Sequence, residues 1–327
     1  MEGPAAGVPV AARHLAPYPH PAVETPEGRP ARLRARAGAE WDRRLYHYIR
    51  VAAWAACSLP RRSAIPVSRA LAMAVLAAPG SARDRHFAAI HQSRARGVAL
   101  EGAARREAVR EAFASYARYW MESLRLPAME PEEVDATFTI EGLQHIEAAR
   151  QAGRGAILAL PHVGGWEVGG SWFVRQGFPL TVVVEALKPP ELFGWFADLR
   201  RSQGFTVIPL SRAAGMSVVR ALRANQIVAL VSDRDIGGGG IQVEFFGEKT
   251  TLPAGPATLA SRLGVPLLPT AVYFDGPGHH AVVRPPVPLE GDVASVTQAL
   301  AHELEDLIRA APEQWHLFQP NWPSDRL

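Results

Sequence analysis

The sequence predicts an α/β fold, with a mostly parallel central sheet covered by helices, on three observations. From residue 138 onward, short apolar runs typical of buried strands alternate with segments of helical spacing. That alternation favours a parallel sheet with helices packed on it. Upstream of residue 138, apolar residues recur at helical spacing only, which predicts an N-terminal helical part. The chain has 327 residues, enough for a sizeable core in one large domain or two small ones.

The composition is that of a globular protein and excludes several kinds of site. Hydrophobic residues make up 48% of the chain, and the formal net charge is only +3. This small charge, without basic and aromatic residues interleaved beyond the N-terminal helices, argues against a nucleic-acid partner. The basic charge is almost all arginine, which suits phosphate contacts but also follows from a G+C-rich coding sequence. The single cysteine, Cys57, excludes an intramolecular disulfide and a cysteine metal cluster, and fits a reducing cytosolic face.

The first segment, residues 1–40, is rich in proline, alanine, glycine and arginine and shows little apolar periodicity. We expect it to be a disordered tail, and it lacks the hydrophobic core of a secretory signal. The rest of the chain, residues 41–327, is expected to form the functional domain. Its predicted parts are interfacial helices over residues 41–80, further helices over residues 81–130, and an α/β core over residues 138–327.

Residues 41–79 hold two apolar helical stretches separated at Pro60. Neither reaches the roughly 18 to 20 apolar residues of a membrane-spanning helix. Aromatic and arginine side chains within and beside them suit helices that lie in a bilayer interface, although packing on the domain core explains the pattern equally well. The side chains concerned are Trp41, Tyr46, Tyr48 and Trp54 beside Arg43, Arg44, Arg50, Arg61 and Arg62.

A continuous helical region is expected over residues 83–126, where an apolar stripe predicts core packing until Pro127 and Pro131 interrupt it. Beyond it, strands and helices alternate. Expected strands cover residues 138–143, 156–160, 180–187, 206–210, 227–233, 241–247, 267–274 and 280–286, with the last two antiparallel at an edge of the sheet. Expected helices cover residues 145–151, 166–176, 191–203, 213–224, 256–263 and 294–310.

The stretch GAILALPHVGGWEVGG, residues 155–170, is the most informative part of the chain. A buried strand delivers His162 to its carboxyl end, and a glycine turn leads into a helix that begins with Trp166 and Glu167. The turn brings Glu167 within reach of the His162 ring. A carboxylate on one imidazole nitrogen fixes the tautomer and leaves the other nitrogen as a general base. The alternative is a structural histidine and a glutamate that serves the helix dipole.

Polar residues follow three of the apolar strands: His162, Glu185 and the run Ser232-Asp233-Arg234-Asp235. Because the carboxyl ends of parallel strands share one crevice, these residues are candidates for a common site. The tetraglycine at residues 237–240 is either a lid or a plain loop.

Other candidates are less tied to strand ends. Glu244 either brings a further carboxylate to the site or is a solvated strand residue. Four arginines, Arg200, Arg201, Arg212 and Arg234, could meet phosphates or lie on the surface. The glycine-rich pieces match neither a Walker loop nor the dinucleotide fingerprint, and the His162 spacing does not fit a helical two-histidine zinc site, so no cofactor and no metal are expected.

These residues together resemble a known family. The segment LPHVGGWE resembles the histidine–four residues–acid motif that bacterial lipid acyltransferases share with glycerolipid acyltransferases. The resemblance continues through VVEALKPPELFGWFADLRRSQGFTVIPL, SDRD, VEFFGEKTTLPAGPATLASRLGVPLLP and PEQWHLFQPNW, and covers roughly residues 46–322. The family includes lipid A acyltransferases and phosphatidylinositol mannoside acyltransferases, and the SDRD and WHLFQPNW segments are more similar to the second branch. This chain departs from that branch in carrying Glu167 where many members carry aspartate, and in its longer glycine run.

The resemblance implies transfer of a long, palmitoyl-like acyl group from acyl-CoA to a mannose hydroxyl of a phosphatidylinositol mannoside. It places the enzyme peripherally at the cytoplasmic face of the cell membrane, on an anionic surface that supplies the glycolipid acceptor. His162 would act as general base with Glu167 as its partner. By resemblance Glu185 and an acidic residue between Asp233 and Glu244 would bind the sugar. Acyl-CoA would be a co-substrate rather than a cofactor.

Two alternatives stay open. The same chemistry could act on a lipid A precursor or another glycolipid, because the motif does not determine the acceptor. The chain could instead be a non-catalytic lipid-binding relative, although the intact His162 and Glu167 argue against that.

Overall fold

The computed structural model describes residues 29–185, 189–211 and 213–325, with the side chains of residues 29–43 and 61 left outside the description. The chain divides into two compact units, Met1–Leu45 and Tyr46–Leu327, and the second contains the whole sheet. The first helix, α1 (Arg29–Ser58), spans this division. Residues 29–40, expected as part of a disordered tail, therefore belong to a helix, and the rest of that predicted tail lies outside the described residues.

A seven-stranded sheet forms the centre of the second unit, in the order β1-β9-β8-β2-β5-β3-β4. All neighbours are parallel except β8 and β9, so the predicted mostly parallel sheet is confirmed. The expectation that β8 and β9 form the edge is wrong, because β1 pairs with the outer side of β9. The strands are β1 (Phe138–Glu141), β2 (Ala156–Leu160), β3 (Leu180–Val184), β4 (Thr206–Pro209), β5 (Ile227–Val231), β8 (Leu267–Asp275) and β9 (Gly278–Val283).

A separate antiparallel hairpin follows the fifth strand. It consists of β6 (Ile241–Phe245), which the sequence predicts, and β7 (Glu248–Leu252), which it does not. The hairpin packs on the last long helix, α11 (Val293–Ala310), rather than joining the central sheet.

Period-two alternation along the central strand β2 divides the core into two layers. Ile157 and Ala159 face one cluster, which α9 (Ala214–Arg223), α10 (Gly255–Leu263) and α11 complete. Ala156, Leu158 and Leu160 face the other, completed by α5 (Pro131–Thr137), α6 (Leu143–Gln151) and α7 (Trp166–Arg175). The sheet is thus buried on both sides, as its uninterrupted apolar strands predict.

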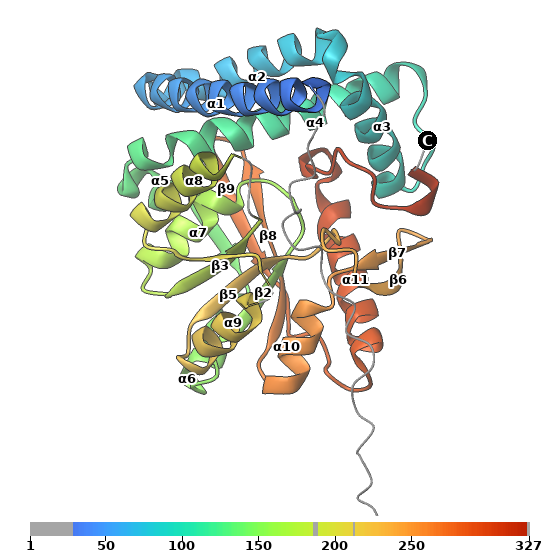
Figure 1. Ribbon diagram of the computed structural model, residues 1–327. Helices are drawn as coiled ribbons and strands as arrows, with labels where there is room; N and C mark the ends of the chain where they lie inside the picture. Colours follow the sequence, from blue (N-terminus) through green and yellow to red (C-terminus); the bar gives the residue numbers. More distant parts are fainter. Residues whose placement is uncertain (1–28, 186–188, 212, 326–327) are drawn as a thin grey trace, which may run out of the picture. The chain divides into compact units, whose positions relative to one another are not determined.

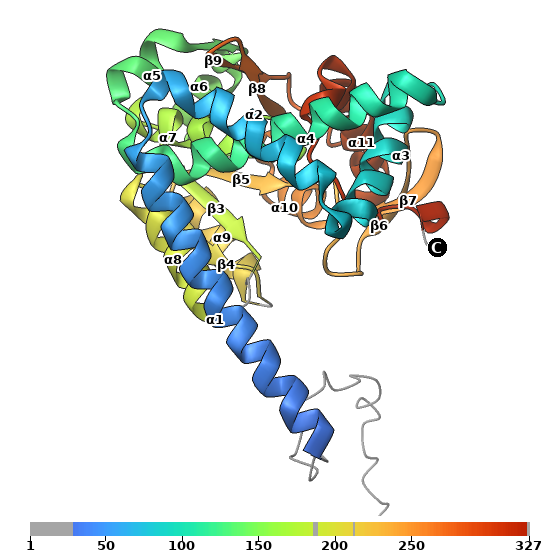
Figure 2. The same cartoon turned by 90° about the horizontal axis from the view of Figure 1, so that it is seen from above.

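Helices α2 (Arg61–Ala77), α3 (Ala82–Arg96) and α4 (Gly102–Arg125) form a further layer across one end of the sheet (Figures 1 and 2). The helix predicted over residues 83–126 is divided because Gly97, at φ 67°, ends α3 in a left-handed cap. The remaining long helix, α8 (Pro190–Ser202), precedes β4. The ring of Tyr119 on α4 stacks on that of Trp166 at 4.1 Å, so this layer covers the carboxyl end of β2.

Within the part of the chain that the structure describes, no single helix is long and apolar enough to cross a membrane. One pair, Arg62–Ala77 with Pro79–Arg96, meets that criterion jointly by length and composition, with a bend of 86° between the two helices.

Candidate active site

The loop that carries His162 is held in place by its backbone. It joins β2 to α7, and Gly164 adopts a positive φ of 61° where a Cβ atom would lie 2.1 Å from the carbonyl oxygen of Val272. Only glycine fits that position. The amide of Gly165 donates to the same Val272 oxygen at 2.8 Å, and the amide of Gly164 donates to the carbonyl oxygen of Gln314 at 3.0 Å. The loop is therefore fixed between β8 and a segment near the C-terminal end.

The parallel register of β2 and β5 brings His162 and Asp233 together. Leu160 is paired with Val231 at the end of the two strands, and His162 and Asp233 each lie two residues beyond. His162 Nδ1 lies 2.6 Å from Asp233 Oδ1, and the backbone amide of His162 donates to Asp233 Oδ2 at 3.0 Å. With the carboxylate as its acceptor, Nδ1 carries the proton, and Nε2 is left as the basic nitrogen.

The two side chains of this pair differ in solvent contact. Asp233 is completely buried, whereas 27% of the His162 side chain is exposed. Burial raises the pKa of Asp233, but the charge and hydrogen bonds of His162 and the indole of Trp315 outweigh it and hold that pKa below its ordinary value. Asp233 is thus an ionised carboxylate that can stabilise an imidazolium, while the ring of His162 remains reachable from solvent.

The predicted contact between Glu167 and the His162 ring is not present; Asp233 occupies that position. Glu167 lies in the first turn of α7 and is directed to Arg200 on α8, whose Nε atom is 3.1 Å from both carboxylate oxygens. A second guanidinium nitrogen of Arg200 also donates to Glu167. Both carboxylate oxygens of Glu167 are thus bound by Arg200, and the predicted pairing of Glu167 with the His162 ring is replaced by pairing with Arg200.

The remaining predicted residues lie in different surroundings. Glu185 is exposed directly after β3, at the sheet edge where Asp233 follows β5. Arg234 donates to the side chain of Gln319. The carboxylate of Asp235 accepts the amides of Gly237, Gly238 and Gly240 at 3.1, 3.0 and 2.8 Å, so it shapes the tetraglycine turn.

Glu244 lies apart from the sheet edge. It is an exposed residue of the hairpin strand β6, opposite Lys249, and its backbone is bound by the side chain of Gln298 on α11. The structure thus brings His162, Asp233 and Glu185 to one edge of the sheet and leaves Glu244 on a separate element.

Three residues near the C-terminal end join the site without having been predicted. Trp315 Nε1 donates to Asp233 Oδ2 at 2.8 Å, and the side-chain amide of Asn321 donates to the Asp233 carbonyl oxygen at 3.1 Å. The backbone amide of His316 donates to the carbonyl oxygen of His162 at 2.8 Å. Burial, helped by the nearby His162, lowers the pKa of His316 to about 3, so its ring stays neutral. The polar and aromatic character of WHLFQPNW was the only signal for them.

Two cavities among the described residues of the second unit are relevant to the site. The smaller, of about 90 Å³, lies between the sheet and α7. Its walls are mainly apolar, and the Glu167–Arg200 pair contributes the charged part of the lining. The larger, of about 640 Å³, is lined by residues of α2, α4 and α5, and none of the predicted site residues borders it. Among the described residues, no group of three or more histidine, cysteine or acidic side chains could hold a metal ion.

Comparison with known proteins agrees with the sequence resemblance. Residues 43–324 match the family model described as bacterial lipid A biosynthesis acyltransferase. A phosphatidylinositol mannoside acyltransferase of Mycobacterium tuberculosis (strain CDC 1551 / Oshkosh) is 44% identical over 217 residues, 64% of this chain and 69% of the relative. One from Mycolicibacterium smegmatis is 42% identical over 221 residues, 66% of this chain and 73% of the relative. A lipid A biosynthesis acyltransferase of Haemophilus influenzae is 30% identical over 182 residues, 53% of this chain and 55% of the relative.

Proposed function

Because this chain belongs to the bacterial lipid A biosynthesis acyltransferase family, we propose that it transfers a long acyl group from acyl-CoA to a mannose hydroxyl of a phosphatidylinositol mannoside. Acyltransferase activity follows from the family, and the mannoside acceptor is suggested by the names of the mycobacterial relatives. The observation that carries the mechanism is the pair in which buried Asp233 holds His162 Nδ1 at 2.6 Å, with the ring partly exposed.

In the proposed reaction, His162 Nε2 takes the proton of the sugar hydroxyl as its oxygen attacks the thioester carbonyl carbon. Asp233 stabilises the imidazolium that forms. The tetrahedral intermediate then collapses, the carbon–sulfur bond breaks, and the departing thiolate of coenzyme A receives the proton from Nε2. The products are the acylated sugar and free coenzyme A, and no covalent acyl-enzyme is required because the thioester is already activated.

The first turn of α7 is suited to stabilise the negative charge on the tetrahedral oxygen. The first amides of a helix have no acceptor within the helix, and the helix dipole favours an anion there. The amide of Gly165 is already bound to Val272, so the amides of residues 166–168 are the ones we propose for this role. Glu185, exposed at the same sheet edge, is the residue we propose to bind the sugar.

The smaller cavity is the part of the molecule that we assign to the acyl chain. Apolar side chains of β2, β3 and β5 form much of its wall, together with Trp166, Phe173 and Phe205. Its volume of about 90 Å³ is smaller than the roughly 150 Å³ of an engineered apolar cavity that holds one benzene molecule. A palmitoyl chain therefore has to widen the cavity by moving side chains such as Phe205, which makes chain length a property that these side chains control.

We propose that the protein binds peripherally to the cytoplasmic face of the membrane, and exposed apolar residues on two helices support its contact with a bilayer. Tyr48, Val51 and Trp54 follow one another at three-residue steps on α1, and 73% of Trp54 is exposed. Leu71 and Val75 are exposed on α2. Helices with such faces and nearby arginines bind anionic bilayer surfaces, where the glycolipid acceptor resides. The side chains of Trp41, Arg43 and Arg61, expected in this surface, lie outside the described residues.

The test is coenzyme A release from palmitoyl-CoA with and without a mannosylated phosphatidylinositol, for the wild type and His162→Ala. We expect acceptor-dependent release that falls about a hundred- to ten-thousand-fold in the variant, because a general base is removed. A variant with the wild-type rate would refute the role of His162. No release by the wild type with this acceptor would refute the mannoside assignment.

A second acceptor is favoured by one observation, the 30% identity to the lipid A biosynthesis acyltransferase of Haemophilus influenzae. The same pair and cavity would then serve a lipid A precursor. Replacing the mannoside by such a precursor in the release assay separates the two acceptors, since a tenfold preference in kcat/KM identifies the one that the site fits.

A further inference from the structure

A segment near the C-terminal end of the chain contacts the loop that carries His162. Residues 314–316 pair with residues 162–164 in an antiparallel bridge centred on Val163 and Trp315. The amide of His316 donates to the carbonyl oxygen of His162 at 2.8 Å, and the amide of Gly164 donates to that of Gln314 at 3.0 Å. The backbone that positions His162 is therefore bound directly to a segment about 150 residues further along the chain.

The same segment holds Asp233 from the side opposite the imidazole. Trp315 Nε1 donates to Asp233 Oδ2 at 2.8 Å, while Oδ1 accepts from His162 Nδ1. The side-chain amide of Asn321 donates to the Asp233 carbonyl oxygen at 3.1 Å. Trp315 is 1% exposed, so its indole cannot be replaced by water without a rearrangement of the core. Together with the backbone amide of His162, which donates to the same Oδ2 atom at 3.0 Å, the indole fixes the rotation of the carboxylate and directs Oδ1 to the ring.

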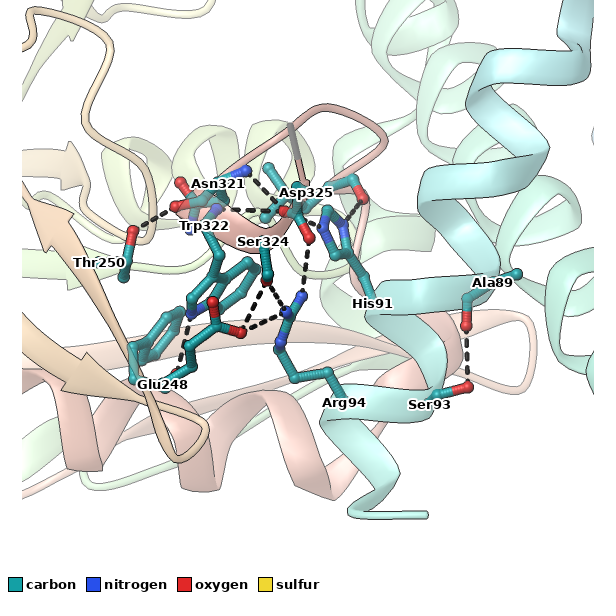
Figure 3. Close-up of polar contacts among 12 residues, drawn as sticks. Ala89, His91, Ser93, Arg94, Glu248, Thr250, Asn321, Trp322, Ser324 and Asp325 are labelled. Atoms are coloured by element: carbon teal, nitrogen blue, oxygen red, sulfur yellow. Dashed lines mark hydrogen bonds and ion pairs between the residues drawn. The ribbon is translucent and has the colours of Figure 1, made fainter. Parts of the chain in front are cut away.

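The end of the segment is anchored on α3, as Figure 3 shows. Asp325 Oδ2 accepts the backbone amides of Asn321 and Trp322 at 2.9 and 3.1 Å and lies 3.1 Å from His91 Nε2. Arg94 donates to the other oxygen of Asp325 at 3.2 Å and to Glu248 at 2.8 Å. Because Asp325 is buried, these contacts hold the turn that carries Asn321 in one conformation.

We infer that Trp315 and Asn321 are positioning residues of the acyl transfer, which act by holding Asp233 against His162. This inference rests on the proposed pairing of His162 with Asp233. Trp315 is buried, and Asn321 directs its side-chain amide to the Asp233 backbone, so their loss should lower kcat and leave the KM for acyl-CoA unchanged. Hydrogen bonds to charged groups are worth about 1.5–3 kcal/mol, which corresponds to a fall in kcat of about ten- to a hundred-fold for Trp315→Phe.

The experiment compares Trp315→Phe with Trp322→Phe. Both indoles are buried, but Trp322 Nε1 donates to the carbonyl oxygen of Phe245 at 3.0 Å, and its substitution keeps the backbone amide bound by Asp325. We expect both variants to unfold at lower temperature than the wild type. Only Trp315→Phe should have a lower kcat, while the kcat of Trp322→Phe should stay within about twofold of the wild-type value.

The pH–rate profile separates a positioning role from a structural one. Without the indole donor, the negative charge of Asp233 is less neutralised and stabilises the imidazolium form of His162 more strongly. The pKa of the ring should therefore rise, and the acid limb of the pH–rate profile of Trp315→Phe should move to higher pH. The neighbouring Tyr119 and His316 do not titrate near neutral pH, because burial raises the pKa of the first well above its ordinary value and lowers that of the second to about 3. Of the other charged groups at this edge, Glu167 and Arg200 neutralise each other, Arg234 donates to Gln319, and Asp235 accepts the amides of the tetraglycine turn. Glu185 is exposed, and all of these groups are unchanged in both tryptophan variants.

Equal kcat and equal pH profiles for the two tryptophan variants would overturn the inference. If Trp315→Phe does not fold, Asn321→Ala provides the same test: a several-fold fall in kcat supports the inference, and an unchanged kcat overturns it. Asp233→Asn is measured alongside. An inactive Asp233→Asn with a fully active Trp315→Phe refutes only the positioning role, whereas a fully active Asp233→Asn refutes the proposed pair itself.

Discussion

Replacing Asp233 with asparagine inverts the hydrogen bonding of His162, the proposed general base. Three donors converge on this carboxylate: His162 Nδ1 on Oδ1, and the His162 amide and Trp315 Nε1 on Oδ2. Asparagine has one oxygen and one NH₂ group. The His162 amide and Trp315 Nε1 both require an oxygen at the Oδ2 position, so the NH₂ group of the asparagine faces Nδ1 of His162. Nδ1 must then accept a hydrogen bond, and the ring proton moves to Nε2. A protonated Nε2 cannot act as a base.

The expected loss in kcat for Asp233→Asn is therefore that of removing the base, about a hundred- to ten-thousand-fold, with the fold retained. The assay is the initial rate of coenzyme A release with saturating palmitoyl-CoA and acceptor, measured across the pH range. The control is Asp306→Asn, the same chemical change at a position of α11 whose side chain is 54% exposed. If Asp233→Asn retains the wild-type rate within tenfold, the assigned tautomer and the partner role of Asp233 are both wrong.

Four further outcomes are expected. Glu167→Gln should lower the free energy of unfolding by up to about 3 kcal/mol in chemical denaturation, because it breaks the nearly buried ion pair with Arg200. The acid limb of its pH–rate profile should match that of the wild type, and a shifted limb would show that Glu167 acts on the His162 ring after all. Ala229→Leu fills the smaller cavity and should favour decanoyl- over palmitoyl-CoA; an unchanged ratio would move the acyl site elsewhere. Trp54→Glu should weaken co-sedimentation with anionic vesicles without changing the unfolding midpoint, and undiminished binding would exclude this helix face. Burial raises the pKa of Asp325, but its hydrogen bonds outweigh burial and hold that pKa below the ordinary 3.8. The ionised carboxylate therefore stabilises the fold above pH 3.8, and this contribution is lost as the pH falls. Asp325→Asn should make the free energy of unfolding less dependent on pH in the acid range, and an unchanged dependence would contradict the role of Asp325.

The fold class could be predicted from the sequence because buried parallel strands have an unusually plain pattern. Runs such as AILAL and IVALV are apolar at every position, since helices cover both faces of the sheet. The place of β9 could not be predicted. Its neighbour β1 lies about 140 residues earlier in the chain, and no local pattern records that pairing.

The candidate site illustrates the same limit of local patterns. Sequence reasoning placed His162 and Asp233 at strand ends that share one edge, but it chose Glu167 as the partner because five residues are a short distance along the chain. The parallel register decides otherwise: β2 and β5 are neighbours, so residues 71 positions apart meet. Trp315 is more remote still, and only the folded backbone brings its indole to the same carboxylate.

The most direct test of the proposed activity is the mass of the acceptor lipid after incubation with palmitoyl-CoA and enzyme. We predict that a mannosylated phosphatidylinositol gains one palmitoyl group with the wild type and none with His162→Ala at equal protein concentration. Coenzyme A release that leaves the mass of the lipid unchanged would contradict acyl transfer to this acceptor. Equal palmitoylation by the His162→Ala variant would contradict the base on which the mechanism depends.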